Sequence, residues 1–204
     1  MEEEELLCGL LVLFGYALGA VPFGIVVSMA LHLPDPRTVG SRNVGFTNVL
    51  RVSGVKPGVL TLLGDMGKGW VIGWAAMQWL HTESFIMVAA LSPIVGHIFS
   101  PFLAFKGGKG VATALGSVLG LSPSIGTLLL LIWMGAVAIW RYSSGGALAA
   151  FGLFPVVAIV NEQRQEFLIF AIVVSTLVWI KHKDNIARLW KGTEGKIGQK
   201  TLAT

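Results

Sequence analysis

Long apolar runs alternate with short polar or glycine-rich segments along nearly the whole chain. A helix needs about 20 apolar residues to cross the hydrocarbon core of a bilayer. The run from Gly110 to Trp140 is too long for one crossing, and Leu121-Ser122-Pro123 divides it into a short helix and one of normal length. The pattern predicts an all-α integral membrane protein, a single domain over residues 1–204 with seven transmembrane helices. Their approximate ranges are 6–31, 57–80, 85–105, 110–121, 123–140, 145–160 and 165–181, followed by a polar tail at 182–204.

Glycine and proline shape the first two of these runs. Gly15 and Gly19 have the small-xxx-small spacing that lets membrane helices pack closely. Pro34 and Pro36 are expected to end the first helix. The residues that follow, 35–56, are polar and glycine-rich and are interpreted as a loop. The glycine-rich segment 64–69 is expected to interrupt the second run.

Lysine and arginine gather on one side of the predicted membrane. With seven crossings, 13 of the 15 basic residues lie in segments 34–56, 105–109 and 181–204 and in the turn at Arg141. The loop ends on the opposite side hold only Arg164. Cytoplasmic loops carry the excess of Lys and Arg, so the N-terminus is predicted outside and the C-terminus in the cytoplasm. Six crossings would divide these basic segments between the two sides.

Composition supports a membrane protein and limits the classes of molecule that it could bind. Hydrophobic residues make up 54% of the 204 positions and charged residues 13%, whereas a soluble domain averages about 25% charged residues. The net charge is +4, but the basic residues lie between apolar runs, which argues against a nucleic-acid partner. Cys8 is the only cysteine, so no internal disulfide can form. The N-terminus is acidic, unlike a cleaved signal peptide, and the first run is therefore interpreted as a retained span.

The polar loop Gly40-Ser41-Arg42-Asn43-Val44-Gly45-Phe46-Thr47-Asn48-Val49-Leu50-Arg51 lies on the predicted cytoplasmic side. It offers hydroxyl, amide and two guanidinium groups within twelve residues, and its glycines permit unusual backbone angles. Such a loop can surround an oxyanion with hydrogen-bond donors. The alternative is a solvated loop whose arginines contact lipid headgroups, which the density of Asn, Ser, Thr and Gly makes the weaker interpretation.

A second polar segment, Phe105-Lys106-Gly107-Gly108-Lys109-Gly110-Val111-Ala112-Thr113, opens the short fourth helix. The unpaired N–H groups and positive dipole end of a helix start form an anion site. Glycines let an oxygen approach the backbone, and two lysines add charge. It is not a P-loop, because Gly110 stands where Ser or Thr would bind magnesium. Contact of the lysines with lipid headgroups is the alternative.

Two further sets of polar residues share helix faces. Asp65 and Lys68 are three residues apart, and a charged pair inside a bilayer usually faces protein or water. They are interpreted either as a structural ion pair or as a support for the loops. His182, Asn185 and Arg188 follow one another at the same spacing, so on a helix they point the same way.

Several common chemistries are absent from the sequence. No serine stands in a G-x-S-x-G elbow. No two histidines have metal-ligand spacing, so neither zinc nor another metal or cofactor is expected. No histidine is followed five residues later by aspartate, the H-x4-D pattern of common glycerolipid acyltransferases. The remaining cluster of anion-binding donors beside a bilayer suits a substrate with a phosphate at one end and a fatty chain at the other.

Five motifs in this order and spacing resemble the bacterial acyl-phosphate:glycerol-3-phosphate acyltransferases, the PlsY family. They are Ser41-x-Asn43-x-Gly45-x-Thr47-Asn48-x-x-Arg51, Asp65-x-x-Lys68-Gly69, Gly96-His97, the whole segment from Phe105 to Thr113, and His182-x-x-Asn185-Ile186-x-Arg188 followed by Gly192-x-Glu194. One position departs from the family. Its Arg-Tyr-x-Ser-x-x-Ser turn corresponds to residues 141–147, where Ser144 fits the first serine and Ala147 replaces the second.

The resemblance implies a reaction in the bacterial cytoplasmic (inner) membrane. A fatty acyl group moves from acyl phosphate directly to the 1-hydroxyl of sn-glycerol 3-phosphate, giving lysophosphatidic acid and phosphate for phospholipid biosynthesis, without an acyl-enzyme. The partners are these two substrates and the lipid bilayer, and a monomer is compatible with this reading. The implied catalytic residues are Ser41, Arg51, Lys109, His182 and Asn185. The implied substrate-binding residues are Asn43, Gly45, Thr47, Asn48, Lys68, Lys106, Gly107, Gly108, Gly110, Ser144, Arg188 and Glu194.

The general base has two candidates. His182 has an unperturbed pKa near 6.5, and the phosphate of the substrate can also accept the hydroxyl proton, which is slightly favoured because nearby cations oppose protonation of His182. A transporter or channel for a small anion is the alternative function, since it also has broken helices and buried charges. The chain halves show no convincing repeat, and the polar residues gather on one face rather than at the midplane.

Overall fold

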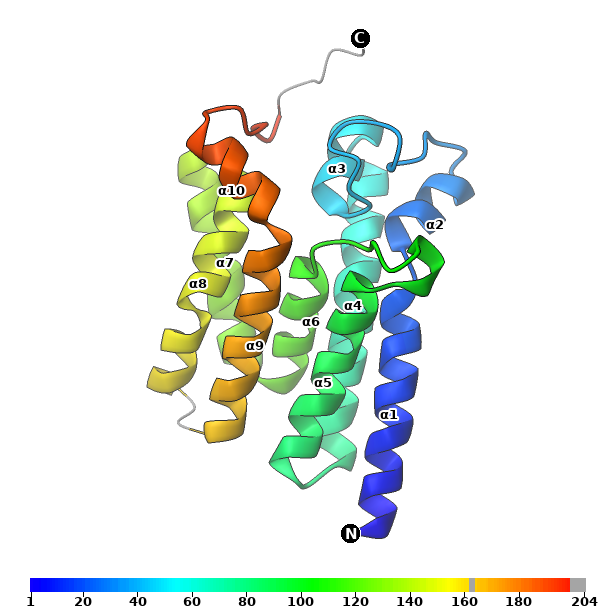
Figure 1. Ribbon diagram of the computed structural model, residues 1–204, viewed down its shortest axis with the longest axis vertical. Coiled ribbons are helices and arrows are strands. Elements are labelled where there is room, and N and C mark those ends of the chain that lie inside the picture. Colours follow the sequence, from blue (N-terminus) through cyan, green and yellow to red (C-terminus); the bar gives the residue numbers. More distant parts are fainter. Residues whose placement is uncertain (162–163, 199–204) are drawn as a thin grey trace.

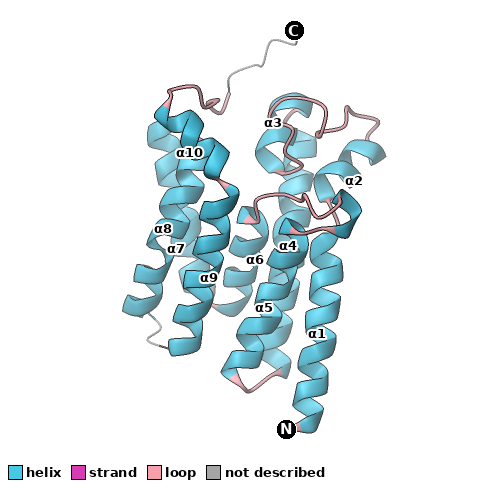
Figure 2. Ribbon diagram, in the orientation of Figure 1, coloured by secondary structure: helices cyan, strands magenta, loops and turns pink. Residues whose placement is uncertain are grey.

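The computed structural model describes residues 1–161 and 164–198, and every regular element in these ranges is a helix (Figure 2). The predicted all-α class is thereby confirmed for this part of the chain. The bounds are α1 Glu2–Ala20, α2 Phe23–Ala30, α3 Phe46–Ser53, α4 Val55–Trp79, α5 Glu83–Ile98, the 3-10 turn η1 Pro101–Leu103, α6 Val111–Leu121, α7 Pro123–Trp140, α8 Ser143–Asn161, α9 Gln165–Lys181 and α10 Lys183–Trp190.

The lengths of the helices suit a membrane protein. Among the described residues, three helical segments are long and apolar enough to cross a membrane alone, namely Glu83–Leu103, Pro123–Trp140 and Ser143–Asn161. The bent pairs, α1 with α2 and α9 with α10, raise this number to five if each counts as one span. Helix α4 has 25 residues but includes charged ones, and α6 has 11, which rise only about 16 Å.

The first predicted span is two helices rather than one. Helices α1 and α2 meet at an angle of 48° across a short break. Pro22 lies in that break, and Val21 before it has an extended backbone. A proline cannot donate a backbone hydrogen bond and disfavours helical angles in the residue before it, which explains the bend. Helix α2 then ends at Ala30, before the prolines that were expected to stop it.

The interpretation of residues 35–56 as a loop is wrong for their second half. Helix α3 occupies Phe46–Ser53, and α4 begins at Val55. Helix α3 buries Asn48 and Val49 and crosses close to α4, where a methyl group on Gly58 would lie 3.0 Å from the Leu50 Cα atom. Burial against α4 therefore stabilises a helix in a segment whose composition resembles a loop.

Helix α4 is continuous through residues 64–69, so the expected interruption is also wrong. Of the glycines in this segment, Gly69 instead serves close contact with α6. A Cβ atom on Gly69 would lie 2.1 Å from the Thr113 carbonyl oxygen, and one on Gly116 would lie 1.9 Å from the Met66 carbonyl oxygen. Side chains larger than glycine would keep these two backbones apart. This contact fixes the position of α6, which begins at the candidate site.

Gly15 and Gly19 serve a similar contact between α1 and α5, as their spacing predicted. Added Cβ atoms there would lie 2.1 Å from the Ser92 Oγ atom and 2.3 Å from the Pro93 carbonyl oxygen. Helix α5 itself ends at Ile98, earlier than the predicted boundary at 105. Residues after η1 adopt left-handed backbone angles, at Ala104 and Phe105 among others, which a helix cannot include.

The remaining predicted ranges agree with α6 to α9 to within two residues at each end. Their core includes a cluster of phenylalanines from α8 and α9, in which Phe154 makes edge-on contacts with Phe151, Phe167 and Phe170. Helix α6 lies between α4 and α5 on one side and α7 to α9 on the other (Figure 1). The start of α1 lies at one end of the bundle, and α3 and α10 lie at the other (Figure 1). Of the predicted tail, residues 199–204 lie outside the described residues.

Candidate active site

A cavity of ≈ 170 Å³ lies near the end of the bundle that carries α3 and α10. It is bounded by the loop before α3, by α3 itself, and by the starts of α6, α8 and α10 together with the tail. These segments are far apart in the sequence. The predicted site residues that line the cavity are Ser41, Asn43, Gly45, Thr47, Asn48, Arg51, Lys109, Gly110, Ser144, His182, Asn185, Arg188 and Glu194.

Four predicted site residues lie elsewhere. Lys106 and Gly107 line a second cavity of ≈ 350 Å³, whose lining also includes two arginines, Arg37 and Arg42. Gly108 packs against the imidazole of His97. Lys68 lies in a buried cluster beneath the loop. The glycine-lysine loop therefore presents its two ends to different cavities.

The backbone of the glycine-lysine loop differs from the expected phosphate cradle. The N–H groups of Gly107 and Gly108 donate to the carbonyl oxygens of Ile98 and His97, each at 3.1 Å. These two N–H groups are therefore already used within the protein. Gly110 has a φ of 81° and precedes the first turn of α6, and Val111 beside it also lines the cavity. The N–H groups of a helix's first turn have no partner within the helix, so they are the better anion donors.

Asn48 organises the loop before α3. Its side-chain oxygen accepts the Ser41 N–H at 2.8 Å. Its amide nitrogen lies 2.9–3.1 Å from three backbone carbonyl oxygens of the loop, those of Pro36, Val39 and Asn43. The side chain is 1% exposed. The structure thus gives Asn48 a role in shaping the loop around the cavity.

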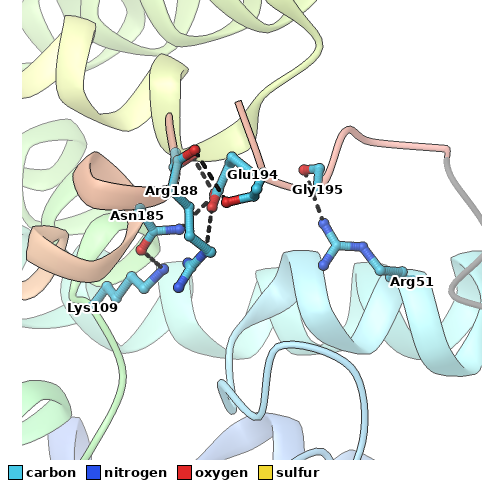
Figure 3. A network of polar contacts seen from close by, with 8 residues as sticks. Arg51, Lys109, Asn185, Arg188, Glu194 and Gly195 are labelled. Atoms are coloured by element: carbon cyan, nitrogen blue, oxygen red, sulfur yellow. Dashed lines mark hydrogen bonds and ion pairs between the residues drawn. The ribbon is translucent and has the colours of Figure 1, made fainter. Parts of the chain in front are cut away.

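Helix α3 is also joined to distant parts of the site. The hydroxyl groups of Thr47 and Ser143 lie 2.8 Å apart, which links α3 to α8. Arg51 donates to the Gly195 carbonyl oxygen at 3.4 Å (Figure 3). These contacts join α3 to the start of α8 and to the segment after α10, and residues of all three line the same cavity.

Glu194 is the centre of a polar network on the tail side (Figure 3). One of its carboxylate oxygens accepts hydrogen bonds from Ser144 and Asn185, both at 2.6 Å, and the other accepts from the Arg188 Nε atom at 2.7 Å. The Asn185 side-chain oxygen in turn accepts a hydrogen bond from Lys109. The network orients two cationic side chains and an amide toward the cavity.

Burial and hydrogen bonding set the charges of this network. Burial lowers the pKa of Lys109 to about 8, although Glu194 opposes the shift. Burial alone would raise the pKa of Glu194, but hydrogen bonds from Ser144, Asn185 and Arg188 lower it below its usual value. At pH 7 Lys109 is therefore mostly an ammonium and Glu194 a carboxylate.

His182 is a buried neutral imidazole. Burial, assisted by the charge of Lys109, lowers its pKa to about 4. Its Nδ1 atom lies 2.7 Å from the Val178 carbonyl oxygen, which can only accept a hydrogen bond. The proton of the neutral ring is therefore on Nδ1, and Nε2 keeps a lone pair. In this tautomer Nε2 is a hydrogen-bond acceptor.

An apolar wall adjoins these polar groups. It is formed by residues of α4, α6 and α7, namely Leu62, Met66, Leu115, Leu130 and Trp133. Ala147, at the position where the family has serine, also lines the cavity. Two lining residues with ionisable side chains, Asp65 and His97, were not among the predicted site residues. The adjacency of the Gly96-His97 motif to the glycine-lysine loop was the signal for the latter.

Similarity to known proteins identifies the family of the chain. The family model described as glycerol-3-phosphate acyltransferase matches residues 9–192. The chain belongs to the glycerol-3-phosphate acyltransferase family. A relative of that name from Methylococcus capsulatus is 43% identical over 193 residues, which cover 95% of this chain and 98% of the relative. One from Nitrosomonas europaea is also 43% identical, over 93% of this chain and 96% of the relative.

Solved structures extend the family likeness to the whole fold. PlsY (YgiH), an integral membrane glycerol 3-phosphate acyltransferase, superposes in its glycerol 3-phosphate form with a TM-score of 0.89 and 38% identity, covering 94% of this chain and 96% of that chain. Its lysophosphatidic acid form superposes with a TM-score of 0.87 and 36% identity, covering 94% and 95%. The predicted membership of the PlsY family and the integral membrane character are thereby confirmed.

Proposed function

We propose that this protein transfers a fatty acyl group from acyl phosphate to the 1-hydroxyl of sn-glycerol 3-phosphate. The observation that carries the proposal is one cavity that joins cationic side chains and the first turn of α6 to an apolar wall. In the reaction the hydroxyl oxygen bonds to the acyl carbon, the bond from that carbon to the phosphate oxygen breaks, and the hydroxyl proton passes to a base. The products are lysophosphatidic acid and inorganic phosphate.

The cations of the cavity suit two phosphate-bearing substrates. Each phosphate carries nearly two negative charges at pH 7, and their mutual repulsion must be offset by nearby positive charge. Lys109, Arg51 and Arg188 line the cavity, and charge-assisted hydrogen bonds to phosphate are the stronger kind. We assign the acyl-phosphate head to Ser41, Asn43 and the start of α6. The glycerol phosphate is assigned to Arg51, Lys109, Ser144, Asn185 and Arg188.

Electrostatics and positioning supply the catalysis in this proposal. Acyl phosphate is already an activated acyl donor, so transfer needs no protein nucleophile. Donors fixed in place stabilise the charge that develops on the acyl oxygen and on the leaving phosphate. The apolar wall holds the acyl chain, and the hydroxyl and the acyl carbon then meet in a fixed geometry.

The proton goes to the substrate's own phosphate in our proposal. His182 with a pKa of about 4 is a weak base, whereas a phosphate monoester has a second pKa near 6. The Nε2 lone pair of His182 accepts a hydrogen bond from a glycerol hydroxyl and orients it. His182 is then a binding residue for the acceptor.

An assay in detergent tests the proposed function. Purified protein is expected to form lysophosphatidic acid and phosphate from acyl phosphate and glycerol 3-phosphate, where no transmembrane gradient exists. A transporter or channel for a small anion would form no product under these conditions. Absence of product from protein that is folded and monodisperse would contradict the proposal.

Direct transfer predicts that no acyl-enzyme forms. Rapid quench of the protein with labelled acyl phosphate, in the absence of glycerol 3-phosphate, is expected to leave no label on the protein. The physical reason is that the phosphate leaving group makes a covalent intermediate unnecessary. Stoichiometric label at Ser41 or Ser144, read by peptide mass analysis, would contradict direct transfer.

His182→Gln is expected mainly to raise KM for glycerol 3-phosphate, because a glutamine amide can keep part of the contact made by Nε2. General base catalysis by His182 would instead lower kcat by about 10²–10⁴-fold. The acidic limb of the kcat–pH profile comes either from His182 or from the phosphate of the substrate. A phosphonate analogue of glycerol 3-phosphate with a higher second pKa distinguishes these two origins. Under substrate assistance the limb moves upward with the analogue in the wild type. An unmoved limb together with a collapse of kcat in His182→Gln would identify His182 as the base.

We further propose seven membrane crossings in the bacterial cytoplasmic membrane, with the N-terminus outside and the cavity facing the cytoplasm. The helices of the proposed crossings alternate in direction, in the order α1 with α2, α4, α5, α6, α7, α8 and α9 (Figure 1). The clustering of basic residues supports this orientation. In a Cys8→Ala background, Glu3→Cys and Lys191→Cys are expected to react with an impermeant thiol reagent from opposite sides of the membrane. Reaction of both from one side would contradict an odd number of crossings.

A further inference from the structure

A buried charged cluster lies beneath the glycine-lysine loop. Asp65, Lys68 and His97 are 1%, 3% and 6% exposed. The Nζ atom of Lys68 lies 2.9 Å from each of three acceptors, the Val21 carbonyl oxygen, Asp65 Oδ1 and His97 Nδ1. An ammonium group has three N–H donors, so this geometry uses all of them inside the protein. None is left for the substrate contact that the sequence suggested for Lys68.

The cluster also determines how His97 faces the loop. A lysine ammonium carries no lone pair, so the nearby Nδ1 atom of His97 accepts a hydrogen bond from Lys68, and the ring proton is on Nε2. A Cβ atom on Gly108 would lie 2.1 Å from that Nε2 atom. The Nε2 edge of the ring therefore lies directly against the Gly108 backbone.

His97 holds the loop through its backbone as well. Its carbonyl oxygen accepts the Gly108 N–H at 3.1 Å, and the next carbonyl, of Ile98, accepts the Gly107 N–H at the same distance. The loop thus contacts His97 through both the main chain and the ring. Lys109 and Gly110, which face the substrate cavity, follow at once in the sequence.

We propose that Asp65, Lys68 and His97 are positioning residues for the proposed acyl transfer. Lys68 and Asp65 fix the orientation of the His97 imidazole, and the imidazole fixes the position of the Gly108 backbone. This places Lys109 and the first turn of α6 against the two substrate phosphates. Lys68 also binds the Val21 carbonyl oxygen at the bend between α1 and α2, so the same ammonium group joins that bend to the loop.

Two replacements of His97 distinguish the role of its Nδ1 atom from that of its Nε2 atom. Asparagine places its oxygen near the position of Nδ1, so His97→Asn keeps an acceptor for Lys68 but removes the edge that touches Gly108. Glutamine reaches the position of Nε2, so His97→Gln keeps a group against Gly108. Gly67→Ala is the matched control for glycine replacement, because a Cβ atom there meets nothing within 4 Å.

The test is a double-mutant cycle on monodisperse protein, read as kcat and as KM for glycerol 3-phosphate. Gly108→Ala is expected to lower kcat/KM by about 10²-fold, since a shift of about 1 Å in a positioned group has that effect. His97→Asn is expected to lower it by about tenfold and to raise KM. The double variant Gly108→Ala/His97→Asn is expected to match His97→Asn, a recovery of about tenfold. Gly108→Ala/His97→Gln is expected to show no recovery, and Gly67→Ala to behave as the wild type.

If the losses in kcat/KM from Gly108→Ala and His97→Asn add independently in the double variant, the proposal is overturned. The ring would then not determine the position of the glycine-lysine loop. If Gly108→Ala yields no folded protein, the single His97→Asn variant decides. A folded His97→Asn variant with wild-type kcat and KM would also overturn the proposal. The inference rests on the proposed acyltransferase activity. An inactive wild type contradicts that function, whereas an active wild type with additive losses contradicts only the positioning role.

Discussion

Replacement of Lys109 by methionine is expected to lower kcat/KM for glycerol 3-phosphate by about 10²–10³-fold, the usual effect of removing one positioned donor from developing negative charge. Methionine keeps most of the apolar stem and removes the charge, so the change acts on the ammonium group. Lys191→Met, at an exposed lysine just after α10, is the matched control and is expected to retain wild-type kinetics. The detergent assay with varied glycerol 3-phosphate provides the measurement. A Lys109→Met variant within threefold of the wild type would show that this ammonium group does not contact substrate.

The same lysine predicts a pH dependence with a definite sign. Burial lowers the pKa of Lys109 to about 8, so the ammonium form dominates below pH 8 and is lost above it. The kcat/KM of the free enzyme is therefore expected to fall as pH rises through about 8. Arginine stays protonated, and Lys109→Arg is expected to move this alkaline limb upward. An alkaline limb that remains unchanged in Lys109→Arg would assign it to another group.

Gly116→Ala is expected to destabilise the protein strongly. The added Cβ atom would lie 1.9 Å from the Met66 carbonyl oxygen, and a backbone atom of α4 cannot yield without separation of α4 from α6. Overpacking of this kind costs about 1–3 kcal/mol, and occasionally more. The midpoint of thermal unfolding in detergent is expected to fall clearly below that of the wild type.

Gly135→Ala in α7 is the matched control for Gly116→Ala. A Cβ atom at position 135 meets nothing within 4 Å, and alanine favours a helix over glycine by up to about 1 kcal/mol. Its midpoint is expected to equal or exceed that of the wild type. Equal midpoints for the two variants would show that the close approach of α4 and α6 does not limit stability.

The sequence predicted the helices wherever an apolar run was long. Helices α7 and α9 begin and end where the runs do, because burial in lipid requires a continuous apolar helix. The short helix α3 escaped prediction. Helix α3 is made of mixed polar and apolar residues. Its stability comes from contact with α4, and the sequence alone does not show which residues of the two helices meet. The bend at Pro22 was visible as a proline but could not be given its angle from the sequence.

For the site, the sequence by itself determined the family and most of the polar residues that line the cavity, and it predicted a phosphate-binding role for them. Motif spacing carries that information because each motif lies within a short stretch of the chain. Only the tertiary structure decided which groups are available to a substrate. Lys68 has its three protons taken by Val21, Asp65 and His97, and the N–H groups of Gly107 and Gly108 are bound to carbonyl oxygens of α5. A donor's availability depends on which acceptors the fold brings within about 3 Å of it, and those acceptors come from other segments of the chain.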